Sequence, residues 1–209
     1  MRQWPRFENM GLWLKILERC ESCAGSIRSG WYRRKFLALE KPRHRLVELG
    51  EGVVFNVPVR GGQGTLRIGT NVMLGYAKAH RLGSGEIMLQ ARLPDAQISI
   101  GTSTVFNNNT VVCAMESITI GERCLIGDSC AIYDSDFHDA DPAKRHTDAG
   151  PSLPVVIGNN VVFGSRVVVL KGVTIGDNSV IGAMSLVTKD IPANCIAAGV
   201  PAKVIKQIE

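Results

Sequence analysis

An aliphatic residue recurs at every sixth position over much of this chain, and this period constrains the fold more than any other feature. A six-residue period matches neither the turn of a helix, about 3.6 residues, nor the two-residue alternation of a long strand. It fits a short strand followed by a turn, with one aliphatic side chain directed inward in each unit. The clearest run consists of Ile157, Phe163, Val169, Ile175, Ile181 and Val187.

Three such units close a triangular coil, and successive coils stack at about 4.8 Å, the spacing of paired strands. Gly often follows the aliphatic residue, and Asn or Asp comes next, as in Asp177 and Asn178. These residue types suit corners where the backbone needs positive φ. Each coil then buries one layer of aliphatic side chains against its neighbours. The pattern predicts an all-β parallel β-helix over residues 51–209, and a β-sandwich with chance spacing is the weaker reading.

Two stretches interrupt the period. Residues 138–154 are polar, contain prolines and lack the repeat, which predicts a loop projecting from one corner. Residues 76–97 are irregular as well, and we interpret them as a distorted coil or a second excursion.

Residues 1–50 form a separate N-terminal segment that is helical and basic. Apolar spacing predicts one amphipathic helix over 8–23 and a second over 29–40. The segment holds 11 of the 24 Lys and Arg residues but 5 of the 19 Asp and Glu residues. The favoured interpretation is a helical cap on the end of the solenoid. The alternative is peripheral contact with a membrane through residues 28–45, where Trp31 and Tyr32 adjoin three consecutive cations.

Composition narrows the class of protein. Hydrophobic residues make up 45% and charged residues 21%, which fits a globular chain. No apolar run reaches the roughly 20 residues that a membrane helix needs, and no secretory signal opens the chain, so we expect a cytoplasmic protein. The six cysteines are expected to be reduced and mostly buried. A basic folded body and a nucleic-acid motif are both absent from the sequence, so no nucleic-acid partner is expected.

The segments 118–139 and 155–205 closely resemble the hexapeptide-repeat acyltransferases, which include galactoside, maltose, nodulation and polysaccharide O-acetyltransferases. The resemblance covers about residues 65–206. It implies a left-handed β-helix, a homotrimer with active sites between subunits, and acetyl-CoA as co-substrate without a metal. It also implies a small-molecule or glycan acceptor.

His138 aligns with the catalytic histidine of that family. A neutral imidazole can take the acceptor's proton near neutral pH, so we expect His138 to be the general base. Asp134 and Asp136 precede it and are candidates to orient its second ring nitrogen, or else are solvated corner residues.

The same resemblance suggests the substrate-binding residues. Asn107 matches an acceptor contact of the sugar acetyltransferases, Glu116 is the carboxylate nearest to the family's acidic contact, and His146 could contact the acceptor from the loop. Met115 stands where the acidic residue itself would align, which departs from a simple galactoside or maltose site. The expected donor contacts are Ser165, Gly182, Ala183, Thr188, Lys203 and Lys206, with the lysines near the phosphates.

Two alternatives remain beside an O-acetyltransferase of a sugar or of a surface-polysaccharide precursor, and a third does not fit the sequence. One is an N-acetyltransferase of an amino-sugar nucleotide or an antibiotic. Another is a non-catalytic β-helix scaffold, which would lack a histidine at the cleft. A γ-type carbonic anhydrase needs three histidines at zinc-ligand spacing, and the spacing of His138, His146 and His80 does not match it. Cys20 and Cys23 are a lone pair without a second pair of zinc ligands.

Overall fold

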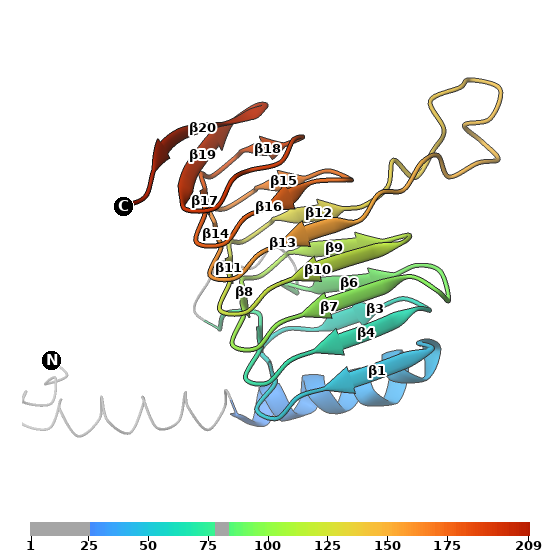
Figure 1. The fold of residues 1–209 in the computed structure, drawn as a ribbon. Helices are drawn as coiled ribbons and strands as arrows, with labels where there is room; N and C mark the ends of the chain where they lie inside the picture. The colour runs from blue at the N-terminus through green and yellow to red at the C-terminus, as the bar shows by residue number, and fades with distance from the viewer. Residues whose placement is uncertain (1–25, 78–83) are drawn as a thin grey trace, which may run out of the picture.

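The computed structural model describes residues 26–77 and 84–209, so the helix expected over 8–23 lies outside the described residues. The chain winds into a three-sided solenoid, with a helix at its N-terminal end and a loop projecting near its C-terminal end (Figure 1). Three sheets, which we name A, B and C, form the sides, and successive strands pass from one sheet to the next. All strand pairs are parallel except β19 with β20. The expected parallel β-helix is confirmed.

The strands are short, as the six-residue period predicts. Sheet A contains β1 (Leu46–Leu49), β4 (Thr65–Ile68), β7 (Gln97–Ile100), β10 (Ser117–Ile120), β13 (Val155–Ile157) and β16 (Thr174–Ile175). Sheet B contains β2 (Val54–Phe55), β5 (Met73–Leu74), β8 (Val105–Phe106), β11 (Leu125–Ile126), β14 (Val162–Phe163), β17 (Val180–Ile181), β19 (Cys195–Gly199) and β20 (Ala202–Gln207). Sheet C contains β3 (Val59–Gly61), β6 (Ile87–Ala91), β9 (Val111–Ala114), β12 (Ala131–Tyr133), β15 (Val168–Val169) and β18 (Leu186–Val187).

The inward side chains form stacked columns that fill the solenoid. In sheet B the strand register places Phe55, Leu74, Phe106, Ile126, Phe163 and Ile181 one above another, all buried. Cys113, Cys124, Cys130 and Cys195 are free thiols and are buried. They act as small packing residues, as expected.

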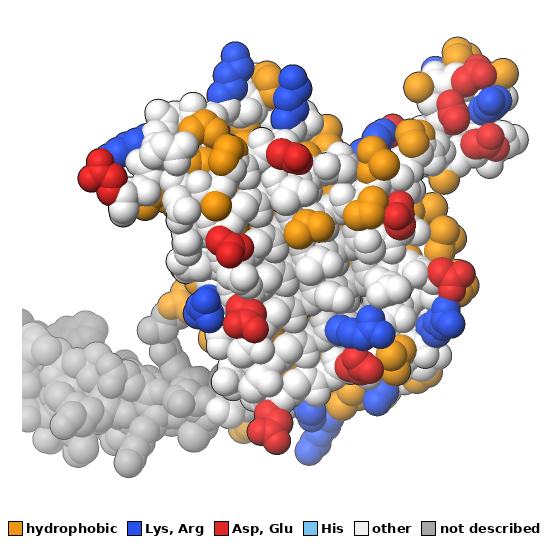
Figure 2. Space-filling model, in the orientation of Figure 1, with side chains coloured by type: hydrophobic (Ala, Val, Ile, Leu, Met, Phe, Trp, Pro, Cys, Tyr) orange, Lys and Arg blue, Asp and Glu red, His pale blue; other side chains and the backbone are white. Residues whose placement is uncertain are grey.

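The outward side chains differ between the three sheets. Sheet A presents a polar column with one aliphatic member, and Figure 2 shows this mixed, largely polar side of the molecule. Its register aligns Glu48, Arg67, Ser99, Thr119, Val156 and Thr174. Sheet B presents an entirely apolar outward column of Val54, Met73, Val105, Leu125, Val162, Val180 and Ile196. Sheet C aligns Arg60, Met88, Val111, Ala131, Val168 and Leu186.

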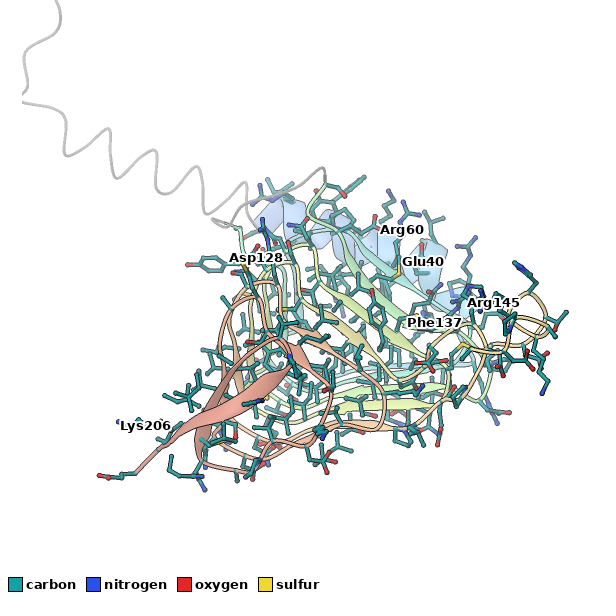
Figure 3. The ribbon with its side chains drawn as sticks, turned by 90° about the horizontal axis from the view of Figure 1, so that it is seen from above. Glu40, Arg60, Asp128, Phe137, Arg145 and Lys206 are labelled. Carbon is teal, nitrogen blue, oxygen red and sulfur yellow. The ribbon has the colours of Figure 1, made fainter. Side chains whose placement is uncertain are left out.

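Three corners join the sheets, and we name them AB, BC and CA after the sheets that each connects. Asp128 lies at corner BC, between β11 and β12, and Phe137 lies at corner CA, after β12. Seen from above, these two residues stand apart on different parts of the solenoid (Figure 3).

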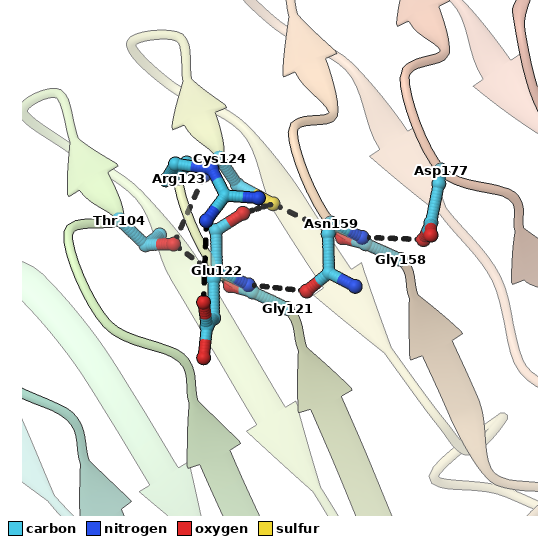
Figure 4. Close-up of polar contacts among 8 residues, drawn as sticks. All are labelled: Thr104, Gly121, Glu122, Arg123, Cys124, Gly158, Asn159 and Asp177. Carbon is cyan, nitrogen blue, oxygen red and sulfur yellow. Dashed lines mark hydrogen bonds and ion pairs between the residues drawn. The ribbon is translucent and has the colours of Figure 1, made fainter.

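Corner AB shows why Gly, and then Asn or Asp, often follow the aliphatic residue. The amide of Glu122 donates to Oδ1 of Asn159 at 2.9 Å, and the amide of Asn159 donates to Oδ1 of Asp177 at 2.7 Å (Figure 4). A Cβ on Gly121 would lie 2.5 Å from the carbonyl oxygen of Gly158 in the next coil. Side-chain amides and carboxylates therefore satisfy the corner amides, while glycine permits the coils to stack closely.

The described part of the N-terminal segment is helical from residue 26 to 43. A π-helical turn η2 (Phe36–Glu40) and a 3-10 turn η3 (Lys41–Arg43) follow the α-helical residues 26–35. Phe36 is buried, and its ring centroid lies 5.3 Å from that of Phe55 in the first coil. This helix therefore covers the N-terminal end of the core. No helix within 26–77 and 84–209 is long and apolar enough to cross a membrane.

The projecting loop leaves corner CA between β12 and β13 (Figure 1). An antiparallel bridge between Ser135 and Ser152 joins its two stems. Part of the irregular stretch 76–97, residues 78–83, lies outside the described residues, and β6 and β7 join sheets C and A from Ile87 onward.

Candidate active site

His138 is exposed at the base of the projecting loop, and one of its ring nitrogens has a defined partner. Its Nδ1 lies 3.0 Å from the backbone carbonyl oxygen of Arg145. A carbonyl oxygen only accepts hydrogen bonds, so Nδ1 carries the hydrogen and the neutral ring keeps its lone pair on Nε2. The geometry therefore assigns Nε2 as the atom that can accept a proton.

The loop holds the Arg145 carbonyl in place through its own hydrogen bonds. The Asp141 carboxylate accepts from the amide of Ala143 at 2.9 Å, and the Asp141 carbonyl accepts from the amide of Arg145 at 2.9 Å. The Arg145 guanidinium donates to the carbonyl of Ala140 at 3.1 Å. These contacts close a compact turn, so the polar sequence of the loop encodes a defined partner for His138.

Gly150 brings the second stem of the loop against the first. Its φ is +72°, and an added Cβ would lie 2.7 Å from the carbonyl oxygen of His138. The amide of Asp139 donates to the carbonyl of Asp148 at 3.1 Å in the same region. Because Gly150 has no side chain, the second stem can pack directly against the backbone of His138.

Asp134 is fully buried and points away from this arrangement. Its Oδ1 accepts from the amide of Met115 at 2.8 Å, and its Oδ2 accepts from the amide of Glu116 at 2.8 Å. Burial raises the pKa of Asp134 above its ordinary value, and hydrogen bonds from backbone amides oppose that rise. Asp134 therefore holds together two successive coils at corner CA.

Asp136 is half-exposed and forms an ion pair with Lys171. Asp134 and Asp136, which were candidates either to orient His138 or to be corner residues, are both engaged elsewhere, and the partner of Nδ1 is the Arg145 carbonyl. No residue type in the sequence marks this contact, because a backbone carbonyl is available from any residue and only the loop conformation selects one.

Four of the expected ligand-binding residues lie at corner BC, after strands of sheet B. Strand register aligns Asn107 with Gly182, and aligns Ser165 with Ala183 in the adjacent column. The Ser165 hydroxyl contacts the Asp128 carboxylate, and the Asn107 side-chain oxygen accepts from the Asn108 amide at 2.9 Å. Ala183 is exposed. Corner BC therefore offers the small side chains of Ser165 and Ala183 beside the exposed Arg166 and Met184.

Gly182 was expected among the donor contacts, and the structure gives a packing reason for its missing side chain. A Cβ on Gly182 would lie 2.7 Å from the Cβ of Ala198, in the next strand of the stack. The missing side chain therefore serves coil stacking, because that position faces protein and not open space.

The remaining donor candidates are divided between corners. Lys203 is exposed on β20 opposite Ala198, at the C-terminal end of corner BC. Lys206 is exposed further along β20, opposite Ile196. Thr188 is exposed just after β18, which places it at corner CA, on the side of His138.

The acceptor candidates Glu116 and His146 also belong to corner CA and its loop, and both are exposed. A groove of about 680 Å³ lies between the loop and the coils that precede it in the chain. We name it the CA groove. Arg92 and Phe137, which the sequence analysis did not select, line it together with Gln63, Gln90, Met115 and Ala149. The position of Phe137 directly before His138 was the only available signal.

The candidate residues therefore lie at two corners of one chain, at opposite ends of sheet C. Six residues separate Asn108 from Met115, which is roughly 20 Å of extended strand. Asn107, Ser165, Ala183 and Lys203 lie at one end, and His138, Glu116 and Thr188 at the other. One chain does not bring both sets into a single cleft.

Comparison with known proteins gives the family. Residues 154–189 match the model described as bacterial transferase hexapeptide (six repeats). Galactoside O-acetyltransferase of Escherichia coli (strain K12) is 45% identical over 113 residues, which are 54% of this chain and 55% of that protein. The match thus spans about half the length of such curated relatives.

Two solved structures cover more of the chain. A maltose O-acetyltransferase from Clostridium difficile 630 is 30% identical with a TM-score of 0.54, covering 78% of this chain and 71% of that one. A galactoside acetyltransferase in complex with coenzyme A is 30% identical with a TM-score of 0.58, covering 90% and 80%. The solenoid is a left-handed parallel β-helix, the fold class of these neighbours. The chain belongs to the hexapeptide-repeat transferase family.

Proposed function

We propose that this protein is an acetyltransferase that moves the acetyl group of acetyl-CoA to a hydroxyl group of a sugar, with His138 as general base. The observation that carries the proposal is the Nδ1 contact of His138 with the Arg145 carbonyl, which leaves Nε2 to accept a proton. The similarity to a galactoside acetyltransferase bound to coenzyme A supports the donor, and the names of the sugar acetyltransferase relatives support the acceptor class.

Acetyl transfer needs one group that first accepts a proton and later returns it. Nε2 of His138 takes the proton of the acceptor hydroxyl while the oxygen attacks the thioester carbonyl. The Arg145 carbonyl stabilises the imidazolium through Nδ1–H. When the tetrahedral intermediate collapses, the C–S bond breaks, and the imidazolium returns its proton to the leaving thiolate. The products are the acetyl ester and free coenzyme A.

Corner BC supplies the donor surface in this proposal. Ala183 and Ser165 are small residues at this corner, so a pantetheine arm can approach the backbone there. Ser165 contributes a hydroxyl group beside Asp128. The exposed ammonium groups of Lys203 and Lys206 suit the phosphates of the nucleotide. We assign Gly182 no contact, because its open side faces Ala198.

The active protein in this proposal is a homotrimer whose sites lie between subunits. Corner BC with the donor candidates and corner CA with His138 form one site only when two chains meet. The outward column of sheet B is apolar, and that of sheet C is apolar from Met88 to Leu186, whereas sheet A is polar, so two sides of each chain gain from being covered. Each interface of the proposed trimer pairs two different faces of neighbouring subunits, which is a heterologous interface. Three such interfaces close the ring.

The described end of the N-terminal segment also supports peripheral attachment to an anionic membrane. Trp31 is 56% exposed, and the Nζ of Lys35 lies 5.2 Å from the centroid of its ring. Arg33 and Arg34 are exposed beside it. Cations next to an exposed aromatic ring suit an anionic lipid surface. Sedimentation with anionic vesicles tests this: Trp31→Ala lowers the bound fraction, and equal binding to neutral vesicles contradicts it.

The free cysteines suit a cytoplasmic setting.

Thiol release from acetyl-CoA tests the main proposal. The full chain is supplied with acetyl-CoA and a panel of sugars, and free coenzyme A is followed with a thiol reagent. We expect release that depends on an added sugar and is lost in His138→Asn, with coenzyme A binding by calorimetry unchanged. Absence of coenzyme A binding in the wild type contradicts the acetyltransferase and favours a non-catalytic scaffold. Release that needs an amino group on the acceptor contradicts O-acetylation and favours an N-acetyltransferase.

A further inference from the structure

The CA groove lies beside the two loop stems next to the candidate base. Phe137, which precedes His138, and Ala149, which precedes Gly150, both line it. Because Gly150 packs on the carbonyl of His138, the groove and the imidazole share the same two loop stems. A molecule seated in this groove therefore lies at the base of the loop that carries His138.

The charge of the groove is positive. Arg43 and Arg92 line it together with Gln63 and Gln90, and none of its described lining residues is Asp or Glu. Arg43 lies 3.7 Å from the Glu40 carboxylate, which offsets part of its charge. In contrast, no ion pair formed among residues 26–77 and 84–209 includes Arg92.

Two acidic groups near corner CA are already engaged, and the exposed Glu116 is not among the residues that line the groove. The Asp134 carboxylate is buried behind the amides of Met115 and Glu116, which it accepts from. Asp136 is paired with Lys171. The Arg92 guanidinium is therefore the groove's main uncompensated charge.

Phe137 holds this guanidinium in place. The Cζ of Arg92 lies 5.3 Å from the centroid of the Phe137 ring, and the Tyr133 ring meets the same ring edge-on at 5.6 Å. Phe137 has φ of +60°, a backbone conformation that an aromatic residue rarely adopts. Backbone strain of this kind is typical of sites where a side chain must be aimed.

We propose that Arg92, stacked on Phe137, binds an anionic group of the acceptor, so that the acceptor is a carboxylated or phosphorylated sugar. This rests on the proposed acetyltransferase function. The planar guanidinium can form two parallel hydrogen bonds with either a carboxylate or a phosphate. Phe137 and Met115 provide an apolar surface for the C–H face of the sugar ring. Held at both points, the sugar directs a hydroxyl group toward His138.

Direct binding tests the anion site without any turnover. Methyl glucoside, methyl glucuronide and glucose 1-phosphate share one ring, and they carry no anion, a carboxylate and a phosphate, respectively. Binding of each to the full chain is measured by ligand-observed NMR. We expect one charged probe to bind at least about tenfold more tightly than methyl glucoside, as suits a charge-assisted pair. The preferred probe identifies the source of the anion.

Variants assign the preference to Arg92. Arg92→Met keeps the length of the side chain and removes its charge, so the tenfold preference is lost. Arg92→Lys keeps the charge without the fork and retains part of the preference. Arg67→Met, on the polar face of sheet A, is the matched control and keeps the full preference. No preference for either charged probe in the wild type, or a full preference in Arg92→Met, overturns the proposal.

Thiol release separates this proposal from the acetyltransferase function. Arg92-dependent binding without sugar-dependent thiol release leaves the anion site standing and contradicts the acetyltransferase. Thiol release that proceeds equally with neutral and charged sugars supports the acetyltransferase and contradicts the anion site.

Discussion

The Nδ1 atom of His138 lies 3.0 Å from the carbonyl oxygen of Arg145, seven residues further along the projecting loop. This contact determines which ring nitrogen carries the hydrogen and which can act as a base. It also ties the position of the imidazole to the conformation of the loop. Both consequences can be tested separately, because the loop hydrogen bond and the basic nitrogen belong to different atoms.

His138→Asn separates these two functions. The Asn side-chain amide can still donate to the Arg145 carbonyl, whereas the basic Nε2 is lost. We expect kcat to fall by roughly a hundredfold or more, which is the usual contribution of a general base. Coenzyme A binding and the melting temperature stay close to wild type. If His138→Asn retains wild-type kcat in steady-state assays, His138 is not the base.

Gly150→Ala tests whether the second stem positions His138. The new Cβ would lie 2.7 Å from the His138 carbonyl, at a φ of +72° that alanine tolerates poorly. We expect a lower kcat with unchanged coenzyme A affinity. Gly30→Ala is the matched control, because no atom lies within 4 Å of its added Cβ. That helical substitution should raise stability by up to about 1 kcal/mol. Equal kcat in both variants contradicts the positioning argument.

Asp134→Ala should destabilise the fold, because two partly buried backbone amides lose their buried acceptor. Leaving buried donors unsatisfied costs about 1–3 kcal/mol each. The half-exposed Asp136, paired with Lys171, provides the comparison: Asp136→Ala should cost less than about 1 kcal/mol. Denaturant unfolding measures both. A larger loss of unfolding free energy for Asp136→Ala than for Asp134→Ala would contradict the stabilising role assigned to the hydrogen bonds of Asp134.

Leu125→Lys should dissociate the proposed trimer. Leu125 is 50% exposed in the apolar column of sheet B, where a lysine would be buried without a partner. Val156→Lys is the matched control, since Val156 is 42% exposed on the polar sheet A. Light scattering after size-exclusion chromatography should give the mass of one chain for the first variant and of three for the second. Thiol release should be lost with the trimer. An active monomer would place the whole site within one chain.

The buried thiols should make stability fall at alkaline pH. Burial raises the pKa of Cys113 and of Cys130 from 9.0 to about 11. The folded chain holds these two protons more tightly than the unfolded chain does. The contribution of the two thiols to the free energy of unfolding is therefore complete below pH 9 and is lost as pH rises toward 11. Native alkylation at pH 8, mapped by mass spectrometry, should leave both thiols unmodified. Rapid labelling of Cys113 would show that the coil opens locally.

The six-residue period determined the solenoid, because it operates locally. Each aliphatic residue directs one side chain inward, and each Gly followed by Asn or Asp turns the next corner, whatever the rest of the chain does. Ile157 and Ile175 could therefore be placed in one buried column from the sequence alone. The loop was predictable for the same reason, since residues 138–154 lack the period. The position of His138 followed from the resemblance carried by the neighbouring repeats.

The tertiary structure alone decided what surrounds His138. Its partner is a backbone carbonyl, which no residue type marks in a sequence, so Asp134 and Asp136 were reasonable but incorrect candidates for that contact. Only the stacked coils show that Gly182 faces Ala198. The stacking of Arg92 on Phe137 joins residues 45 positions apart, and that contact depends on the number of residues in the intervening coils and on the path of the loop. A local repeat specifies each coil, but contacts between coils arise only when the coils are stacked.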